Sequence, residues 1–148
     1  MARPVSALII DDNDHSRRLL KEILESTGMS IHETPDASHA LRLLGMSRID
    51  LVVTDYEMSP MSGIELTKRI RMHGNPAVRG CGILMVTGYA DRKHVVEAAR
   101  VGIDGLITKP FTAGMVLERT MYVLERAALR NAGPEDRADA DRYVGLDD

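Results

Sequence analysis

Short apolar runs alternate with segments of helical periodicity along most of this chain. Each apolar run ends at a turn signal, which predicts a buried strand, and the periodic segment after it predicts a helix. Five such pairs indicate helices packed around a parallel sheet. The run at residues 29–34 mixes polar with apolar positions, as an edge strand does. The predicted strands are residues 5–10, 29–34, 49–54, 83–86 and 105–108.

The last two predicted helices each have an expected buried face. Asp91 is placed to cap the first of them, which ends at Gly102. The second begins near Thr112 and carries an apolar stripe. The segment 73–82 is interpreted as a surface loop. The expected buried residues are Val95, Val96 and Ala99 in the first helix, and Leu117, Met121, Leu124 and Ala128 in the second.

Five strand–helix pairs favour a flavodoxin-like (βα)5 fold of the α/β class, with a doubly wound parallel five-stranded sheet in the order 2-1-3-4-5. In such a sheet, ligands bind beyond the carboxyl ends of the strands, where the strand order reverses. Polar side chains stand at these ends: Asp11 and Asp12 after the first strand, Asp55 after the third, Thr87 after the fourth and Lys109 after the fifth. We therefore expect three carboxylates, a hydroxyl and an ammonium group in one pocket.

This combination of groups suits phosphoryl chemistry. Three neighbouring carboxylates repel one another, and hard oxygen ligands without His or Cys favour Mg²⁺. A carboxylate can attack phosphorus to give an acyl phosphate. Lys109 and Thr87 could then stabilise the charge of the phosphoryl group. Each residue also has a structural interpretation: Asp11 and Asp12 as helix caps, Asp55 and Thr87 as turn residues, and Lys109 as a solvated charge. Their joint placement favours the site.

The chain resembles the receiver (response-regulator) domain of bacterial two-component phosphorelay systems over about residues 4–130. The resemblance implies that Asp55 is the phosphoacceptor. It implies that Asp12 binds Mg²⁺ directly, that Asp11 acts largely through a metal-bound water, and that the backbone carbonyl of Glu57 is a further ligand. The matching segments are Leu8-Ile9-Ile10-Asp11-Asp12-Asn13, Val52-Val53-Thr54-Asp55 followed by Met58, Met61-Ser62-Gly63, Met85-Val86-Thr87-Gly88 and Lys109-Pro110-Phe111.

The resemblance also implies how the domain would work. Thr87 and Lys109 would contact the phosphoryl oxygens, and the Lys109-Pro110 peptide bond would be cis. The phosphoryl donor would be a phosphohistidine on a histidine kinase or a histidine phosphotransferase. The domain would catalyse its own phosphorylation and slow dephosphorylation, which leaves open whether it counts as a turnover enzyme. A downstream protein would bind the face formed by the helix after Asp91, strand 105–108 and the last helix.

Several positions depart from the family pattern. Leu106 stands where the family usually has a Phe or Tyr that reports phosphorylation, and Pro60 follows Ser59 one residue later than the usual Pro. Glu57 and Tyr89 each lie two residues after a site residue, where receivers tune the access of water. Our hypothesis is that Tyr89 shields the phosphoryl group while Glu57 adds negative charge at its edge; alternatively, both are exposed loop side chains without kinetic effect.

The resemblance favours a stand-alone receiver whose phosphorylation switches its binding to another protein. Three other functions compete with this hypothesis. A relay intermediate or phosphate sink would pass phosphoryl groups between His residues, and Leu106 favours it because such a protein needs no output switch. A haloacid-dehalogenase-like phosphatase would place its nucleophile after the first strand, whereas Asp55 follows the third. A flavodoxin that binds FMN fits the fold, but three carboxylates would repel the FMN phosphate.

Composition limits the partners. Residues 131–148 hold six acidic and two basic side chains, so the net charge of −3 for the whole chain leaves residues 1–130 at +1. A nearly neutral body with 3% aromatic residues argues against nucleic-acid binding. The apolar runs are too short to span a membrane, and the single cysteine fits a cytoplasmic protein. We expect a receiver domain at residues 1–130, with no separate output domain, and an acidic flexible tail at 131–148. Within that tail, residues 143–146 are either a docking peptide or part of a disordered end.

Overall fold

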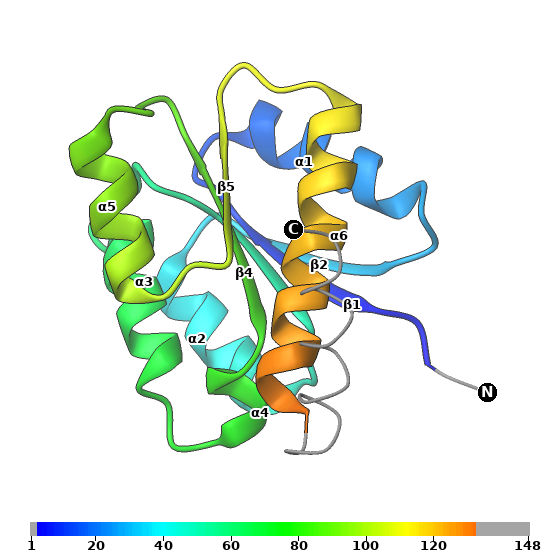
Figure 1. Ribbon diagram of the computed structural model, residues 1–148. Helices are drawn as coiled ribbons and strands as arrows, with labels where there is room; N and C mark the ends of the chain where they lie inside the picture. Colours follow the sequence, from blue (N-terminus) through cyan, green and yellow to red (C-terminus); the bar gives the residue numbers. More distant parts are fainter. Residues whose placement is uncertain (1–2, 133–148) are drawn as a thin grey trace, which may run out of the picture.

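A computed structural model describes residues 3–132 of the chain. Five parallel strands form one sheet in the order β2-β1-β3-β4-β5 (Figure 1). This order confirms the predicted (βα)5 fold, and each strand boundary agrees with the prediction to within two residues. The strands are β1 (Ser6–Ile10), β2 (Ser30–Thr34), β3 (Leu51–Asp55), β4 (Gly82–Thr87) and β5 (Gly105–Thr108).

Helices cover both faces of the sheet. In Figure 1, α1 and α6 lie on one side of the strands, and α2, α3 and α5 lie on the other. Within the described residues, no helix is both long and apolar enough to cross a membrane. The helices are α1 (Asp14–Glu25), α2 (Ala37–Met46), α3 (Gly63–Arg71), α4 (Pro76–Arg79), α5 (Arg92–Val101) and α6 (Ala113–Asn131).

The three central strands are apolar because both of their faces are buried. Alternate residues point to opposite faces, so Ile9 and Val53 enter the core under α1 and α6, while Ile10 and Val52 enter the core under α2 and α3. The strands β1, β3 and β4 are almost wholly buried. In contrast, β2 lies at the edge and is mostly exposed, as its mixed sequence predicts.

The buried face of α6 differs from the prediction. The helix buries Val116, Thr120, Val123 and Ala127, whereas Met121 is 57% exposed and Ala128 is exposed; the predicted Leu117 and Leu124 are only partly buried. The predicted and the observed set of buried residues both have helical spacing, so packing against the sheet determines which set is buried. A Cβ atom added at Gly82 or Gly105 would lie 2.8 Å from a methyl carbon of Val123. These two glycines therefore create the space that Val123 fills.

Two further local predictions were wrong. In α5, the fully buried residue is Ala98, while Val95 and Ala99 are exposed, because the helix contacts the small cluster around Met85 through a narrow face. The segment 73–82 is not simply a surface loop. It contains α4, whose amino end is capped by the Asn75 side chain, and it buries Val78 and Cys81.

Most helix caps come from the residue types that favour this position. Asn13, not Asp11 or Asp12, caps α1, because its side chain accepts a hydrogen bond from the Ser16 N–H at 2.9 Å. This leaves the two aspartates free for another role. The predicted cap Asp91 does occupy the N-cap position of α5, but its side chain accepts no capping hydrogen bond and contacts His94 Nδ1 instead.

A buried carboxylate joins three segments at the amino-terminal edge of the sheet. Asp104 is 6% exposed and accepts hydrogen bonds from Arg71 Nη2 at 2.9 Å, from Arg130 Nη1 at 2.6 Å and from the Ile83 N–H at 3.0 Å. Because Arg71 ends α3 and Arg130 lies near the end of α6, Asp104 ties the two helices to β4. Sequence periodicity gave no signal for this cluster, whose members are far apart in the chain.

Candidate functional site

The topology brings the three predicted carboxylates together. Asp11 follows β1, Asp12 comes next in the chain, and Asp55 ends β3, the strand beside β1. One carboxylate oxygen from each residue lies within 4.8 Å of the other two. Asp11 and Asp55 are buried, while Asp12 is exposed to solvent. The sheet therefore places a three-carboxylate cluster at the carboxyl ends of its central strands, as the sequence predicts.

Backbone contacts fix the segments that carry these carboxylates. Asp11 accepts a hydrogen bond from the Asn13 N–H at 2.9 Å, so its side chain is tied to the start of α1. After Asp55, the Tyr56 N–H donates to the Val86 carbonyl at 2.8 Å, and the Gly63 N–H donates to the Tyr56 carbonyl at 3.0 Å. A Cβ atom at Gly63 would collide with the Asp55 carbonyl oxygen. Only glycine therefore lets α3 begin this close to the end of β3.

Lys109 lies beside the two buried carboxylates. Its Nζ is 3.3 Å from Asp55 Oδ1 and 3.6 Å from Asp11 Oδ2. Burial and the nearby charge of Asp11 raise the pKa of Asp55 to about 7, although Lys109 opposes this effect. Burial disfavours the charged form of Lys109, but the charges of Asp11 and Asp55 outweigh burial and raise the pKa of Lys109. The site thus holds more negative charge than one ammonium group neutralises.

The carboxylate cluster fits a divalent cation with hard oxygen ligands. Asp11 Oδ2 and Asp55 Oδ1 are buried oxygen atoms that share the single ammonium group of Lys109 and accept no further hydrogen bond within the described residues. Buried acceptors without donors are costly in a native protein. A Mg²⁺ ion takes one or two carboxylates and retains several waters. Two buried carboxylate oxygens that share one lysine, together with the exposed Asp12, match that requirement.

Thr87 is buried at the end of β4 and already has two partners. Its Oγ1 donates to Glu57 Oε1 at 2.7 Å and accepts the Tyr89 N–H at 3.0 Å. Glu57 therefore interacts directly with a residue of the predicted site.

The peptide bond before Pro110 is cis, as the resemblance implied, and so is the bond before Pro60.

The predicted residue Tyr89 belongs to an aromatic cluster beside the site, and the other two members, Tyr56 and His94, were not predicted as site residues. The rings of Tyr89 and His94 stack with centroids 5.3 Å apart, and Tyr56 meets His94 edge-on at 5.2 Å. Tyr56 also donates a hydrogen bond from its hydroxyl to Glu97 Oε1 at 2.9 Å. The residue directly after Asp55 is thereby linked to α5. Tyr56 is not one of the residues that match the receiver motifs, so the sequence did not identify it as part of the site.

Leu106 lies in β5 at the position where the family usually has an aromatic residue. Its side chain is half-buried and packs against the cluster formed by Ile64, Met85 and Ala98. An aliphatic side chain in this place contributes to packing between the sheet and α5. It supplies no aromatic ring that could rotate between the core and the surface.

A parallel sheet in this order, with an acidic cluster and a lysine at its carboxyl edge, defines the architecture of a receiver domain. The comparisons with known proteins agree. A family model described as "Response regulator receiver domain" matches residues 7–120. Chemotaxis protein CheY-3 of Vibrio cholerae is 38% identical over 120 residues, which cover 80% of this chain and 91% of that protein. Chemotaxis protein CheY of Pseudomonas aeruginosa is 36% identical over 120 residues, with coverages of 80% and 95%.

Solved structures show the same similarity. The chemotaxis response regulator CheY4 of Vibrio cholerae matches with a TM-score of 0.76 at 26% identity, covering 82% of this chain and 99% of that chain. The chain belongs to the response regulator receiver family. Accepting a phosphoryl group is the general function of such domains, which bind Mg²⁺ at an acidic site and interact with histidine kinases or phosphotransferases and with downstream targets.

Proposed function

We propose that this receiver accepts a phosphoryl group from a phosphohistidine partner onto Asp55 and thereby switches its binding to another protein. The observation that carries the proposal is the buried Asp55 carboxylate, which lies next to Asp11 with Lys109 Nζ only 3.3 Å away. This arrangement combines a nucleophile, a cluster of oxygen ligands and a cation at one edge of the sheet.

The residues divide the chemistry between them. Asp11, Asp12, Asp55 and the backbone carbonyl of Glu57 would hold Mg²⁺, which when bound supplies positive charge that keeps the carboxylates ionised and neutralises phosphoryl oxygens. An Asp55 oxygen attacks phosphorus, the P–N bond of the phosphohistidine breaks, and the imidazole leaves with the bond's electron pair. Lys109 pairs with the phosphoryl oxygens as their charge develops.

Labelling with a small phosphodonor tests this proposal. Incubation with acetyl phosphate and Mg²⁺ should add one phosphoryl group that hydroxylamine removes, as expected for an acyl phosphate. Mass spectrometry of the digested protein should locate the group on the peptide that contains Asp55. Chelation of Mg²⁺ should prevent the labelling. A label that survives hydroxylamine, or one located on a different peptide, would contradict the proposal.

Glu57 is proposed to restrain Thr87 before phosphorylation. The Thr87 hydroxyl must leave the Glu57 carboxylate before it can donate to a phosphoryl oxygen, because it has only one proton to donate. A Glu57→Gln variant offers a weaker, neutral acceptor and removes a negative charge near the site. We expect its labelling by acetyl phosphate to be roughly threefold faster, equivalent to a barrier lower by about 0.7 kcal/mol. A rate equal to or below that of the parent would argue against the restraint.

Tyr89 is proposed to shield the acyl phosphate from water. Its backbone already contacts Thr87, although the residue as a whole is 55% exposed and its ring stacks on His94. In Tyr89→Ala, we expect the acyl phosphate to hydrolyse roughly fivefold faster, a barrier change of about 1 kcal/mol. The lifetime of the phosphorylated chain measures this directly. The exposed Tyr122, on α6, gives the matched control Tyr122→Ala, which should leave the lifetime unchanged. A Tyr89→Ala lifetime equal to that of the parent would exclude shielding.

The proposed output surface is the face formed by α5, β5 and α6. Because Leu106 provides no aromatic ring, part of the coupling must run through Thr87 and the loop after β4. Beryllofluoride with Mg²⁺, which mimics the phosphoryl group, should change backbone chemical shifts on this face. Unchanged shifts there would contradict a phosphorylation-dependent switch.

A relay role is the second candidate, and Leu106 is the observation that favours it. A protein that only passes phosphoryl groups between His residues needs no aromatic reporter. We expect a relay to return its phosphoryl group from Asp55 to a histidine phosphotransferase at a rate comparable to the forward transfer. Transfer experiments with the radiolabelled chain measure both rates. Forward transfer followed only by release of inorganic phosphate would leave the switch as the better account.

Three predictions from the sequence remain proposals. These are the boundary between a receiver at residues 1–130 and a tail at 131–148, the stand-alone form of the receiver, and its cytoplasmic location. The tail prediction concerns residues of which 133–148 lie outside the described part of the chain. The match of the family model to residues 7–120 is consistent with the proposed receiver boundary.

A further inference from the structure

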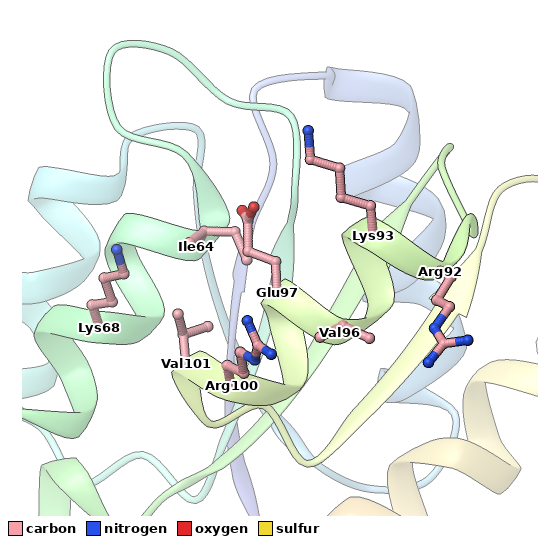
Figure 2. A pocket seen from close by; sticks show the side chains of 8 residues that line it. All are labelled: Ile64, Lys68, Arg92, Lys93, Val96, Glu97, Arg100 and Val101. Atoms are coloured by element: carbon pink, nitrogen blue, oxygen red, sulfur yellow. The ribbon is translucent and has the colours of Figure 1, made fainter.

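A large groove, whose lining includes none of the three clustered carboxylates, lies between α3 and α5. Its volume is about 960 Å³, and its lining comes only from these two helices. Figure 2 shows the lining side chains of α3 beside those of α5. We call this feature the α3–α5 groove. Its lining residues are Ile64, Lys68, Arg92, Lys93, Val96, Glu97, Arg100 and Val101.

The groove combines an apolar floor with a basic rim. Ile64 is buried, and Val96 and Val101 are half-buried, so the floor presents aliphatic carbon. The rim carries four exposed cations and one exposed carboxylate, that of Glu97, which gives a formal charge of +3. A site with this chemistry suits a segment that has both apolar and acidic side chains. The four cations are Lys68, Arg92, Lys93 and Arg100.

The rim cations lack an acidic partner in the part of the chain that the structure describes. Exposed cations elsewhere on the described surface do form ion pairs, such as Arg69 with Glu65 at 3.2 Å on α3 and Lys21 with Glu25 at 3.7 Å on α1. Within residues 3–132, none of the four rim cations forms such a pair. Their like charges repel one another across the groove, and an acidic ligand would relieve that repulsion.

The carboxy-terminal sequence has the complementary chemistry. Residues 133–148, which lie outside the described residues, carry six acidic and two basic side chains and a formal charge of −4. Tyr143, Val144 and Leu146 are apolar, and Asp147 and Asp148 follow them directly. This short segment offers apolar side chains for the floor and carboxylates for the rim.

The chain can reach the groove from the end of α6. Arg130 and Arg71 share the Asp104 carboxylate, and Arg71 Nε donates to the Gly102 carbonyl at 2.9 Å. Gly102 directly follows Val101, which lines the groove. A series of hydrogen bonds through Asp104 and Arg71 therefore connects the end of α6 with the end of α5 that lines the groove. The ten residues from 133 to 142 can span up to about 33 Å when extended.

We propose that residues 143–148 bind in the α3–α5 groove of their own chain, held by the contact of aliphatic carbon on the floor and by ion pairs between Asp147 or Asp148 and the rim cations. The occupied groove would adjoin the phosphorylation site, because Glu97 on its rim accepts the hydrogen bond from Tyr56, the residue after Asp55. Binding of the tail does not require phosphoryl transfer, so this inference can fail or succeed independently of the proposed function.

A spin label on the full chain tests the proposal. Cys81 is buried, and burial raises the pKa of its thiol to about 11, so a nitroxide reagent should react preferentially with a second cysteine introduced by Gly145→Cys. We expect the label to reduce the methyl signals of Ile64, Val96 and Val101 by more than half relative to the reduced, diamagnetic label. Leu20 and Leu24 of α1, on the opposite face of the sheet, should keep their signals.

Charge variants and a mixing experiment make the outcome decisive. Lys68→Glu/Arg100→Glu should abolish the broadening, and adding Asp147→Lys/Asp148→Lys to it should restore most of it. The control Arg18→Glu/Arg42→Glu, which reverses two exposed cations outside the groove, should have no effect. Raising the salt concentration from 50 to 500 mM should weaken the broadening. The proposal is overturned if the groove signals are not broadened, or if Lys68→Glu/Arg100→Glu leaves the broadening unchanged. Equal broadening between a spin-labelled chain and a separate, unlabelled chain would also overturn it, because the occupant would then be a second copy.

Discussion

Asp55→Asn is expected to reduce Mg²⁺-dependent labelling by acetyl phosphate by at least about a hundredfold, because removal of a nucleophile typically costs several orders of magnitude. The neutral amide is a far weaker nucleophile than the carboxylate, so the P–O bond of the acyl phosphate cannot form. The other groups of the site would remain, since Asn has nearly the same shape as Asp. The loss should therefore appear in the rate of labelling while the fold is retained.

A matched control separates the nucleophile from the general loss of a carboxylate. Asp36 lies just beyond the carboxyl end of β2 and caps α2 by accepting the Ser38 N–H at 2.8 Å. Asn caps helices as well as Asp does. Asp36→Asn therefore removes one negative charge from the same edge of the sheet, and its labelling should match that of the parent. Labelling of Asp55→Asn at the parent's rate would refute the site assignment.

The same Asp55→Asn substitution is expected to stabilise the metal-free chain at pH 8 by about 2 kcal/mol, which corresponds to a rise in Tm of roughly 5 °C or more. The pKa of Asp55 rises from 3.8 to about 7 in the folded state, mainly because of burial and the charge of Asp11. The folded state therefore binds this proton more tightly than the unfolded state does. The parent loses stability relative to the variant as the pH rises from about 4 to 7, and the difference is constant above that range.

Thermal unfolding in EDTA at pH 5 and pH 8 measures this effect. The advantage of Asp55→Asn should be smaller at pH 5, where the parent Asp55 is largely protonated. Adding Mg²⁺ at pH 8 should raise the Tm of the parent more than that of the variant, since the variant lacks one of the three carboxylates. If Asp55→Asn were less stable than the parent at pH 8 without metal, the electrostatic account of the site would be wrong.

The sequence predicts the sheet and the carboxylate cluster well for a physical reason. In a parallel sheet the carboxyl ends of all strands meet at one edge, so the strand order alone places Asp11 and Asp55 side by side. The buried face of α6 was not predictable in this way. The predicted stripe through Met121 and the observed stripe through Val123 have equal helical spacing, and the choice depends on the space at Gly82 and Gly105 in other elements.

Contacts between individual polar or aromatic side chains also could not be predicted from the periodicity of the sequence. The hydrogen bond between Thr87 and Glu57 and the ring contacts of His94 with Tyr56 and Tyr89 join loops that only the folded chain brings together. Such contacts carry no repeat and no spacing signal. They nevertheless lie beside the candidate site, where they decide which partner each side chain already has before a phosphoryl group arrives.

The Asp104 cluster makes the amino-terminal edge of the sheet more rigid than the carboxyl-terminal edge. At the amino-terminal edge, the Asp104 carboxylate binds arginines from helices on opposite faces of the sheet. It thereby crosslinks α3 to α6. The opposite edge, where the loops after β3 and β4 lie, has no comparable crosslink between the two layers in the described part of the chain. The loops after β3 and β4 can therefore change conformation while the Asp104 crosslink keeps α3 and α6 in place at the other edge.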